Sequence, residues 1–139
     1  MDNASKKKLY VITFLIDSFL IYVLFFKYIP LFDILWIFSV LSTHSLFYYG
    51  LMYDDRELID GVHPFVFILP LLSLFAKHIL LKIISLVLVI TIQFLWIKEK
   101  RCIMNELDKN TFGYGDLLHY SMISLTAMLS LNIGYLYRY

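Results

Sequence analysis

The sequence predicts an all-α membrane protein, a polytopic transmembrane helical bundle with about five spans. Apolar residues make up 60% of the 139-residue chain and charged residues only 17%, whereas soluble domains contain about 45–50% and about 25%. A small soluble domain leaves much of its surface in water and could not hide so many apolar side chains. The apolar residues also gather in runs of roughly 20, the length that crosses a bilayer as a helix.

Five spans are predicted within one transmembrane domain, residues 1–139. They cover about residues 9–28, 34–53, 62–76, 79–97 and 117–136. Residues 62–97 are divided in two because one helix of that length would measure about 50 Å, and the polar triplet at 76–78 interrupts the run. The polar segments 54–61 and 98–110 are interpreted as connections in water or lipid headgroups.

The distribution of basic residues orients the chain, because cytoplasmic loops of membrane proteins are enriched in Lys and Arg. With a cytoplasmic amino terminus, five spans place eight basic residues inside and four outside. The inside group is Lys6, Lys7, Lys8, Arg56, Lys98, Lys100, Arg101 and Lys109, and the outside group is Lys27, Lys77, Lys82 and Arg138. Merging the third and fourth spans would reverse this bias, so the charges favour five.

Composition also excludes several kinds of function. The formal net charge is +1, which gives no reason to expect a nucleic-acid partner. The single cysteine, Cys102, cannot form an intramolecular disulfide or a thiolate metal cluster. No metal-ligand spacing, phosphate loop or catalytic triad is present in the sequence, so we expect no cofactor, no metal and no enzymatic activity.

Asp17 and His44 are candidate functional residues, since each lies near the middle of a predicted span. An ionisable group at this depth is costly and is a functional hypothesis by default. Adjacent spans joined by a short turn are antiparallel, so the two side chains can meet at one depth. The pair could accept a proton or line an ion path. The alternative, which we favour, is a polar clasp between two helices.

Small residues mark one face of the last predicted span. Ala127, Ser130 and Gly134 recur at helical spacing, and small side chains allow helices in membranes to approach closely. We interpret this face as a helix-packing surface.

The string Thr111-Phe112-Gly113-Tyr114-Gly115-Asp116 resembles the selectivity filter of potassium channels, which implies an ion-binding strand of backbone carbonyls. In that family an apolar pore helix precedes the filter, whereas residues 98–110 here hold seven charged residues in thirteen. The charge bias also places this loop inside. We therefore interpret the string as a glycine-rich turn, with Asp116 positioned to cap the last helix or oppose its positive end.

A further resemblance covers about a third of the chain. It runs from His63-Pro64 to Trp96 and on through Cys102-Ile103-Met104-Asn105-Glu106-Leu107. This pattern, an apolar hairpin ending in tryptophan and followed by cysteine and glutamate, resembles small multispan membrane proteins of large DNA viruses. The resemblance implies residence in a virion or host-derived membrane and no particular activity.

Together these features predict a multi-pass integral membrane protein that serves as a structural or accessory subunit. Its expected partners are the lipid bilayer and other membrane subunits or further copies of itself. The alternative is a small ion or proton channel that uses Asp17 and His44, or the turn from Thr111 to Asp116.

Overall fold

The computed structural model describes residues 3–26, 28–99 and 114–138, and every regular element in these ranges is a helix. The predicted all-helical class is thereby confirmed for the described residues. The elements are α1 (Asn3–Leu24), α2 (Leu31–Tyr53), α3 (Arg56–Val62), α4 (Phe65–Leu72), the 3₁₀ helix η1 (Ser73–Phe75), α5 (Ile79–Glu99) and α6 (Tyr114–Arg138).

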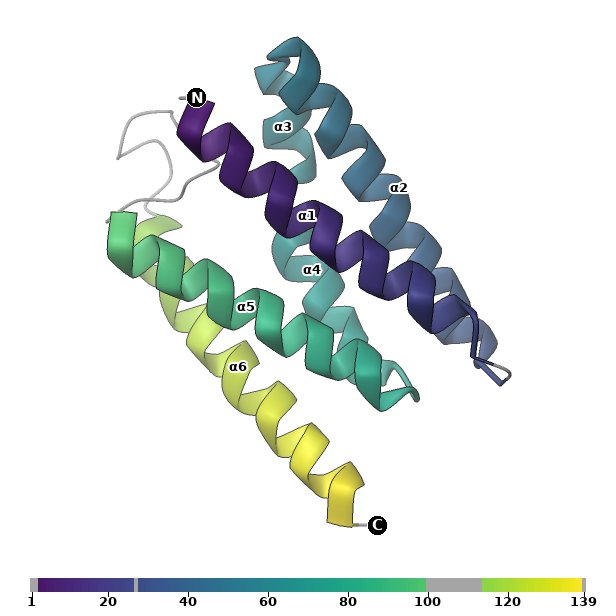
Figure 1. The fold of residues 1–139 in the computed structure, drawn as a ribbon. Coiled ribbons are helices and arrows are strands. Elements are labelled where there is room, and N and C mark those ends of the chain that lie inside the picture. Colours follow the sequence, from purple (N-terminus) through teal and green to yellow (C-terminus); the bar gives the residue numbers. More distant parts are fainter. Residues whose placement is uncertain (1–2, 27, 100–113, 139) are drawn as a thin grey trace.

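The helices run alternately up and down along a common direction (Figure 1). The amino terminus and the junction between α2 and α3 lie at one end of the bundle. The connection between α1 and α2, the start of α5 and the carboxyl terminus lie toward the other end. Because α3, α4 and η1 follow one another in the same general direction, they form a single pass beside α1, α2, α5 and α6 within the described residues.

Three segments of the described residues are long and apolar enough to cross a membrane, judged by length and composition: Leu31–Tyr53, Arg56–Phe75 and Ile79–Lys98. The last two are separated at residues 76–78, where the sequence predicts a break. Helices α1 and α6, which contain the predicted spans 9–28 and 117–136, are not among the three. Those two spans stay predictions.

The structure corrects two boundaries. Residues 54–61 were expected to be a polar connection, yet most of them form α3, because the Asp55 side chain accepts a hydrogen bond from the Leu58 backbone N–H at 3.1 Å and caps this helix. The first helix ends at Leu24, before the predicted end at residue 28. There the N–H groups of Phe25 and Phe26 bond three residues back and tighten the chain into a turn.

The main core lies between α1, α2, the α4–η1 segment and α5. Its buried members are Ile16, Leu20, Val23, Trp36, Ile37, Val40, Leu69, Ala76 and Leu81. Besides filling this core, Trp36 donates its indole N–H to the backbone carbonyl of Leu69 at 2.8 Å. This bond fixes the register of α2 against α4 and satisfies the one polar group of the buried indole.

Helix α6 packs on α5 through a second cluster. Val89 of α5 meets Met122, Leu125 and Leu129 of α6, and all four are buried. Polar contacts flank this apolar seam: Gln93 donates to Thr126 at 2.7 Å on one side, and Lys82 donates to Asn132 on the other. Polar bonds at both ends fix which residues of the two helices face one another.

The start of α5 is held by a residue of α2. Asp33 is fully buried, and its two carboxylate oxygens accept the backbone N–H groups of Lys77 at 3.0 Å and His78 at 2.7 Å. Backbone donors at a helix start have no partner within the helix, and a negative charge there also meets the positive end of the helix dipole. Asp33 thus caps α5 from a distant part of the chain.

A close corner joins α2 to α3. Asp54 adopts a left-handed conformation with φ 56° and forms an ion pair with Lys6 of α1 at 2.7 Å. The hydrogen bond from Lys6 holds the pKa of Asp54 below its ordinary value. Gly50 allows the corner to close, since a Cβ atom at this position would lie 2.9 Å from Cγ1 of Ile59.

Substituting Gly50 by Ala should destabilise the protein. The added Cβ would force Ile59 and α3 away from α2, and overpacking of this kind costs about 1–3 kcal/mol. Gly61→Ala is the matched control, because nothing lies within 4 Å of its added Cβ and alanine is favoured over glycine in a helix by roughly 0.5–1 kcal/mol. Unfolding free energies in mixed detergent micelles should move in opposite directions. Equal changes at both positions would contradict the close approach at Gly50.

Asp33→Asn should also destabilise the protein. An amide has one acceptor oxygen in place of two, so one N–H at the start of α5 would lose its partner, at a cost of about 1–3 kcal/mol. Asp54→Asn is the control, because this carboxylate is exposed and asparagine tolerates the left-handed conformation. Denaturation at neutral pH should leave the Asp54 variant close to the parent. If the Asp33 variant behaved in the same way, the cap would not contribute to stability.

Candidate functional site

Asp17 of α1 and His44 of α2 lie in contact. The Nδ1 atom of His44 is 2.5 Å from Oδ1 of Asp17, and the two side chains are 16% and 15% exposed. The antiparallel path of α1 and α2 brings these residues, 27 positions apart, to the same level of the bundle. The contact joins α1 to α2 through a polar pair that is largely removed from solvent.

Two tyrosines extend the pair toward the amino-terminal end of α1. Tyr48 lies one turn after His44, and its hydroxyl is within hydrogen-bonding reach of Asp17. Its ring stacks on Tyr10, with centroids 5.8 Å apart and planes inclined by 14°. The carboxylate of Asp17 therefore has two polar neighbours on α2, which compensate for its removal from water.

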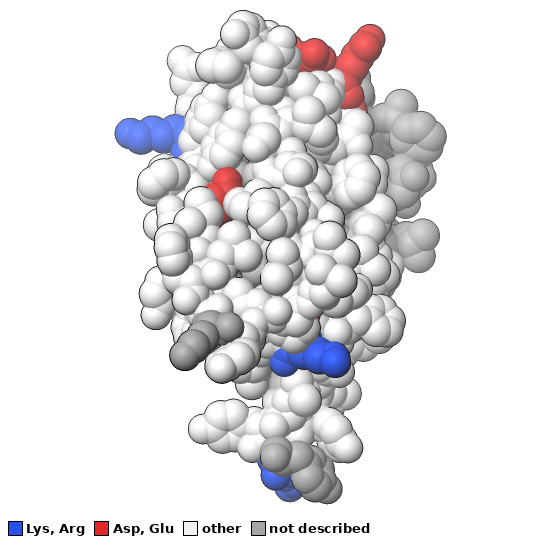
Figure 2. Space-filling model, turned by 90° about the vertical axis from the view of Figure 1, so that its right-hand side faces the viewer, with Lys and Arg blue, Asp and Glu red and all other residues white. Residues whose placement is uncertain are grey.

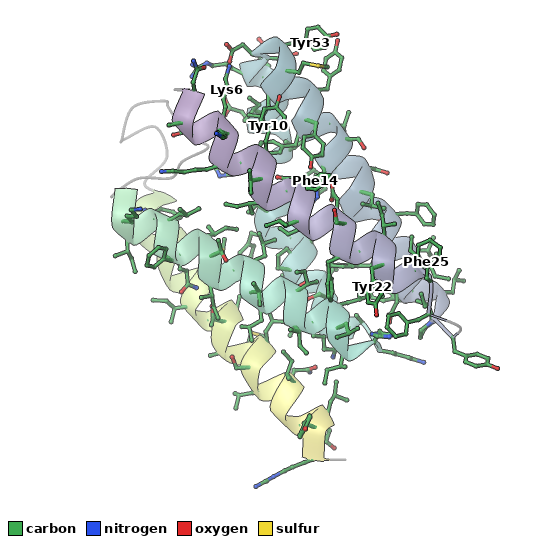
Figure 3. All side chains as sticks on the ribbon, viewed as in Figure 1. Lys6, Tyr10, Phe14, Tyr22, Phe25 and Tyr53 are labelled. Carbon is green, nitrogen blue, oxygen red and sulfur yellow. The ribbon has the colours of Figure 1, made fainter. Side chains whose placement is uncertain are left out.

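An apolar groove of about 530 Å³ runs beside this pair between α1 and α2. Its lining includes Asp17 and Tyr48 together with Tyr10, Phe14 and Ser18. Tyr10 and Phe14 follow one another along α1 in Figure 3. The site is thus a polar pair at the edge of an apolar, outward-facing surface. It can take part in proton exchange or serve as a clasp.

A second polar cluster was missed by the sequence analysis. Lys82 of α5 is 4% exposed, and its ammonium donates to the Leu74 carbonyl at 2.9 Å and to the side chain of Asn132. The Asp33 carboxylate lies within electrostatic range. The hydroxyl of Ser85, one turn along α5, is buried without a partner among the described residues. The sequence does contain a signal for this cluster: Asp33 and Lys82 each lie within about one turn of the start of an apolar helix.

The predicted packing face of α6 points away from the other described helices. Ala127, Ser130 and Gly134 are exposed, and a Cβ added at Gly134 would meet nothing within 4 Å. The opposite face, with Met122 and Leu125, packs on α5. The interpretation of these small residues as a helix-packing surface stays a prediction.

The glycine-rich string falls partly outside the described residues. Thr111 and Gly113 lie there, as does Cys102. Tyr114, Gly115 and Asp116 form the first turn of α6, so the turn interpretation is wrong for these three. A selectivity filter needs an extended strand with carbonyls aimed at the ion, whereas helical carbonyls point along the helix toward later N–H groups.

Within residues 3–26, 28–99 and 114–138, no three His, Cys, Asp or Glu side chains come together in a way that could hold a metal ion. No protein-family model, curated protein or solved structure matches the chain. The function has to be inferred from the contacts and the exposed surfaces of the chain itself.

Proposed function

We propose that this chain is a multi-pass integral membrane protein that acts as a structural or accessory subunit of a membrane assembly. The observation that carries the proposal is the apolar exterior of the bundle. No more than 28% of the most apolar stretch of each of the three candidate spans is buried. Large side chains that stay more than half exposed include Phe14, Leu15, Phe38, Val87, Phe94 and Leu131.

Water is a poor solvent for this exterior. Leaving one large apolar side chain exposed forgoes about 1.5–3 kcal/mol of burial, and soluble monomers rarely expose contiguous apolar patches above a few hundred Å². Figure 2 shows a largely uncharged face with acidic groups at its upper end and basic groups at its lower end, interrupted by one acidic group in its upper half and one basic side chain at its upper left edge. Lipid tails match the uncharged surface, and headgroups match the charged ends.

The accessory role is supported by the outward face of α6. Ala127, Ser130 and Gly134 leave a shallow strip on which another helix can approach closely. We propose other membrane subunits or a second copy of the chain as the partners, with no nucleic acid, no cofactor and no catalytic activity. From the resemblance to small multispan membrane proteins of large DNA viruses, we propose a virion or host-derived membrane as the location of the protein.

Proton conduction is the second candidate, and the short contact between Asp17 and His44 favours it. Histidine is the residue type whose side chain ordinarily changes charge near neutral pH. Intramembrane pairs of this type occur in proton relays. The clasp remains the first choice.

Expressed in cells, the protein should stay with the membrane fraction through alkaline carbonate extraction and dissolve only in detergent.

In a Cys102→Ser background, Lys77→Cys should react with an impermeant maleimide added outside. Glu57→Cys should react only after permeabilisation, because the two positions lie at opposite ends of the bundle. A protein that stays monodisperse in plain buffer would contradict the membrane proposal, and labelling of both cysteines from one side would contradict the topology.

Asp17→Asn separates the clasp from the conductor. Asparagine can still hydrogen-bond His44 and Tyr48, so the unfolding free energy in micelles should fall only modestly, by about 1 kcal/mol. Proton flux into liposomes should match that of protein-free vesicles for parent and variant alike. Asp60→Asn is the control for an exposed carboxylate. A flux present in the parent and in the Asp60 variant, but lost in the Asp17 variant, would reverse the ranking.

A further inference from the structure

The groove beside Asp17 follows one face of α1. Val11, Phe14, Ser18 and Ile21 line it and recur at intervals of three and four residues, the spacing of one helix face. From Tyr10 to Ile21 this face extends for about 16 Å at 1.5 Å per residue. The groove is therefore a long apolar slot parallel to the helix.

The polar side chains in the slot lining are hydrogen-bonded to groups of the protein itself. Asp17 is engaged by His44 at 2.5 Å and lies beside the Tyr48 hydroxyl. The Ser18 hydroxyl donates to the Phe14 carbonyl of its own helix at 2.8 Å. These bonds leave little unsatisfied polarity facing outward, so an apolar chain can lie along the slot.

Lys7 stands at the amino-terminal end of the same face, four residues before Val11 and seven before Phe14. It is exposed, and no contact to it is found among the described residues. Its neighbour Lys6, by contrast, is paired with Asp54 at 2.7 Å; the labelled Lys6 in Figure 3 marks the level at which this end of α1 lies. Among the described residues, Lys7 is thus an unpaired cation one helical turn before the apolar slot on the same face of α1.

We propose that this slot binds one acyl chain of an anionic phospholipid whose phosphate pairs with Lys7. The inference rests on the proposed membrane location. A cation at headgroup level with an apolar slot below it has the charge and shape of such a lipid, and basic residues beside a membrane attract anionic lipids.

The lining favours a lipid over a helix. Phe14 and Leu15 are 64% and 61% exposed along the slot, whereas close helix packing in membranes uses small residues. A second copy related by twofold symmetry would place the same patch on both sides, so that two Lys7 side chains would lie in one interface. A flexible acyl chain can fit between bulky side chains and brings no second Lys7 into the contact.

The test uses the full-length protein reconstituted in phosphatidylcholine vesicles, with spin-labelled phosphatidylglycerol or phosphatidylcholine as the probe. The ratio of motionally restricted phosphatidylglycerol to phosphatidylcholine should be about fivefold for the parent, the preference expected of one basic residue at the surface. Lys7→Gln should bring the ratio near one. Lys77→Gln, which removes an exposed charge at the opposite end of the bundle, should leave it unchanged.

The apolar half of the site is tested separately. Ser18→Trp should lower the preference although Lys7 is retained, because the indole occupies the slot. Leu15→Trp serves the same purpose if the first variant fails to elute like the parent. If phosphatidylglycerol association survives both tryptophans, the slot does not hold the chain and the proposal is overturned.

Three further outcomes would also overturn it. These are no preference in the parent, an equal loss in Lys7→Gln and Lys77→Gln, and disulfide-linked dimers through Ser18→Cys in the Cys102→Ser background. The last result would put a second copy in the slot. Failure to insert into vesicles would instead refute the membrane proposal itself, so the two failures are distinguishable.

Discussion

A carboxylate at the start of one helix that caps another is the contact on which the arrangement of the bundle depends. Asp33 binds the first free N–H groups of α5 while itself fully buried. An ionised group in apolar surroundings is tolerated only when it is paired and hydrogen-bonded. The segment from residue 76 to residue 78 must therefore lie against α2. Lys82 follows one turn later and reaches Leu74 and Asn132, which brings η1 and α6 to the same place.

Other hydrogen bonds between helices fix the rest of the bundle in the same way. Helices surrounded by lipid gain little from apolar contact with one another, because the lipid tails offer the same environment. Hydrogen bonds between helices then decide which faces meet. Asp17 with His44 joins α1 to α2, Trp36 with Leu69 joins α2 to α4, and Gln93 with Thr126 joins α5 to α6. The apolar clusters fill the space between these contacts, but they determine the register of the helices less strictly than the hydrogen bonds do.

The sequence alone could predict the helical class and the break near residue 77, because both follow from the length of apolar runs. The proximity of Asp17 and His44 could also be anticipated, since two adjacent antiparallel helices place mid-helix residues at one level. The cap formed by Asp33 could not. It joins residues 44 and 45 positions apart, and periodicity carries no information on which helix end meets which acid. The small residues of α6 have a similar limit, since they indicate close approach of another helix without saying whether that helix belongs to the same chain.

A clasp and a conductor at Asp17 differ in whether a continuous path of polar groups or water crosses the bundle. A relay needs polar groups or water within hydrogen-bonding distance from one membrane face to the other. The Asp17 contact points toward Tyr48 and Tyr10, at the amino-terminal side, whereas the Lys82 cluster lies toward the opposite end of the bundle. Between these two polar regions lies the main core, where Leu20, Val23 and Ile37 are fully buried. Close-packed apolar side chains of this kind leave no room for a chain of water. This packed apolar core is therefore an argument for the proposed clasp and against the proposed conductor.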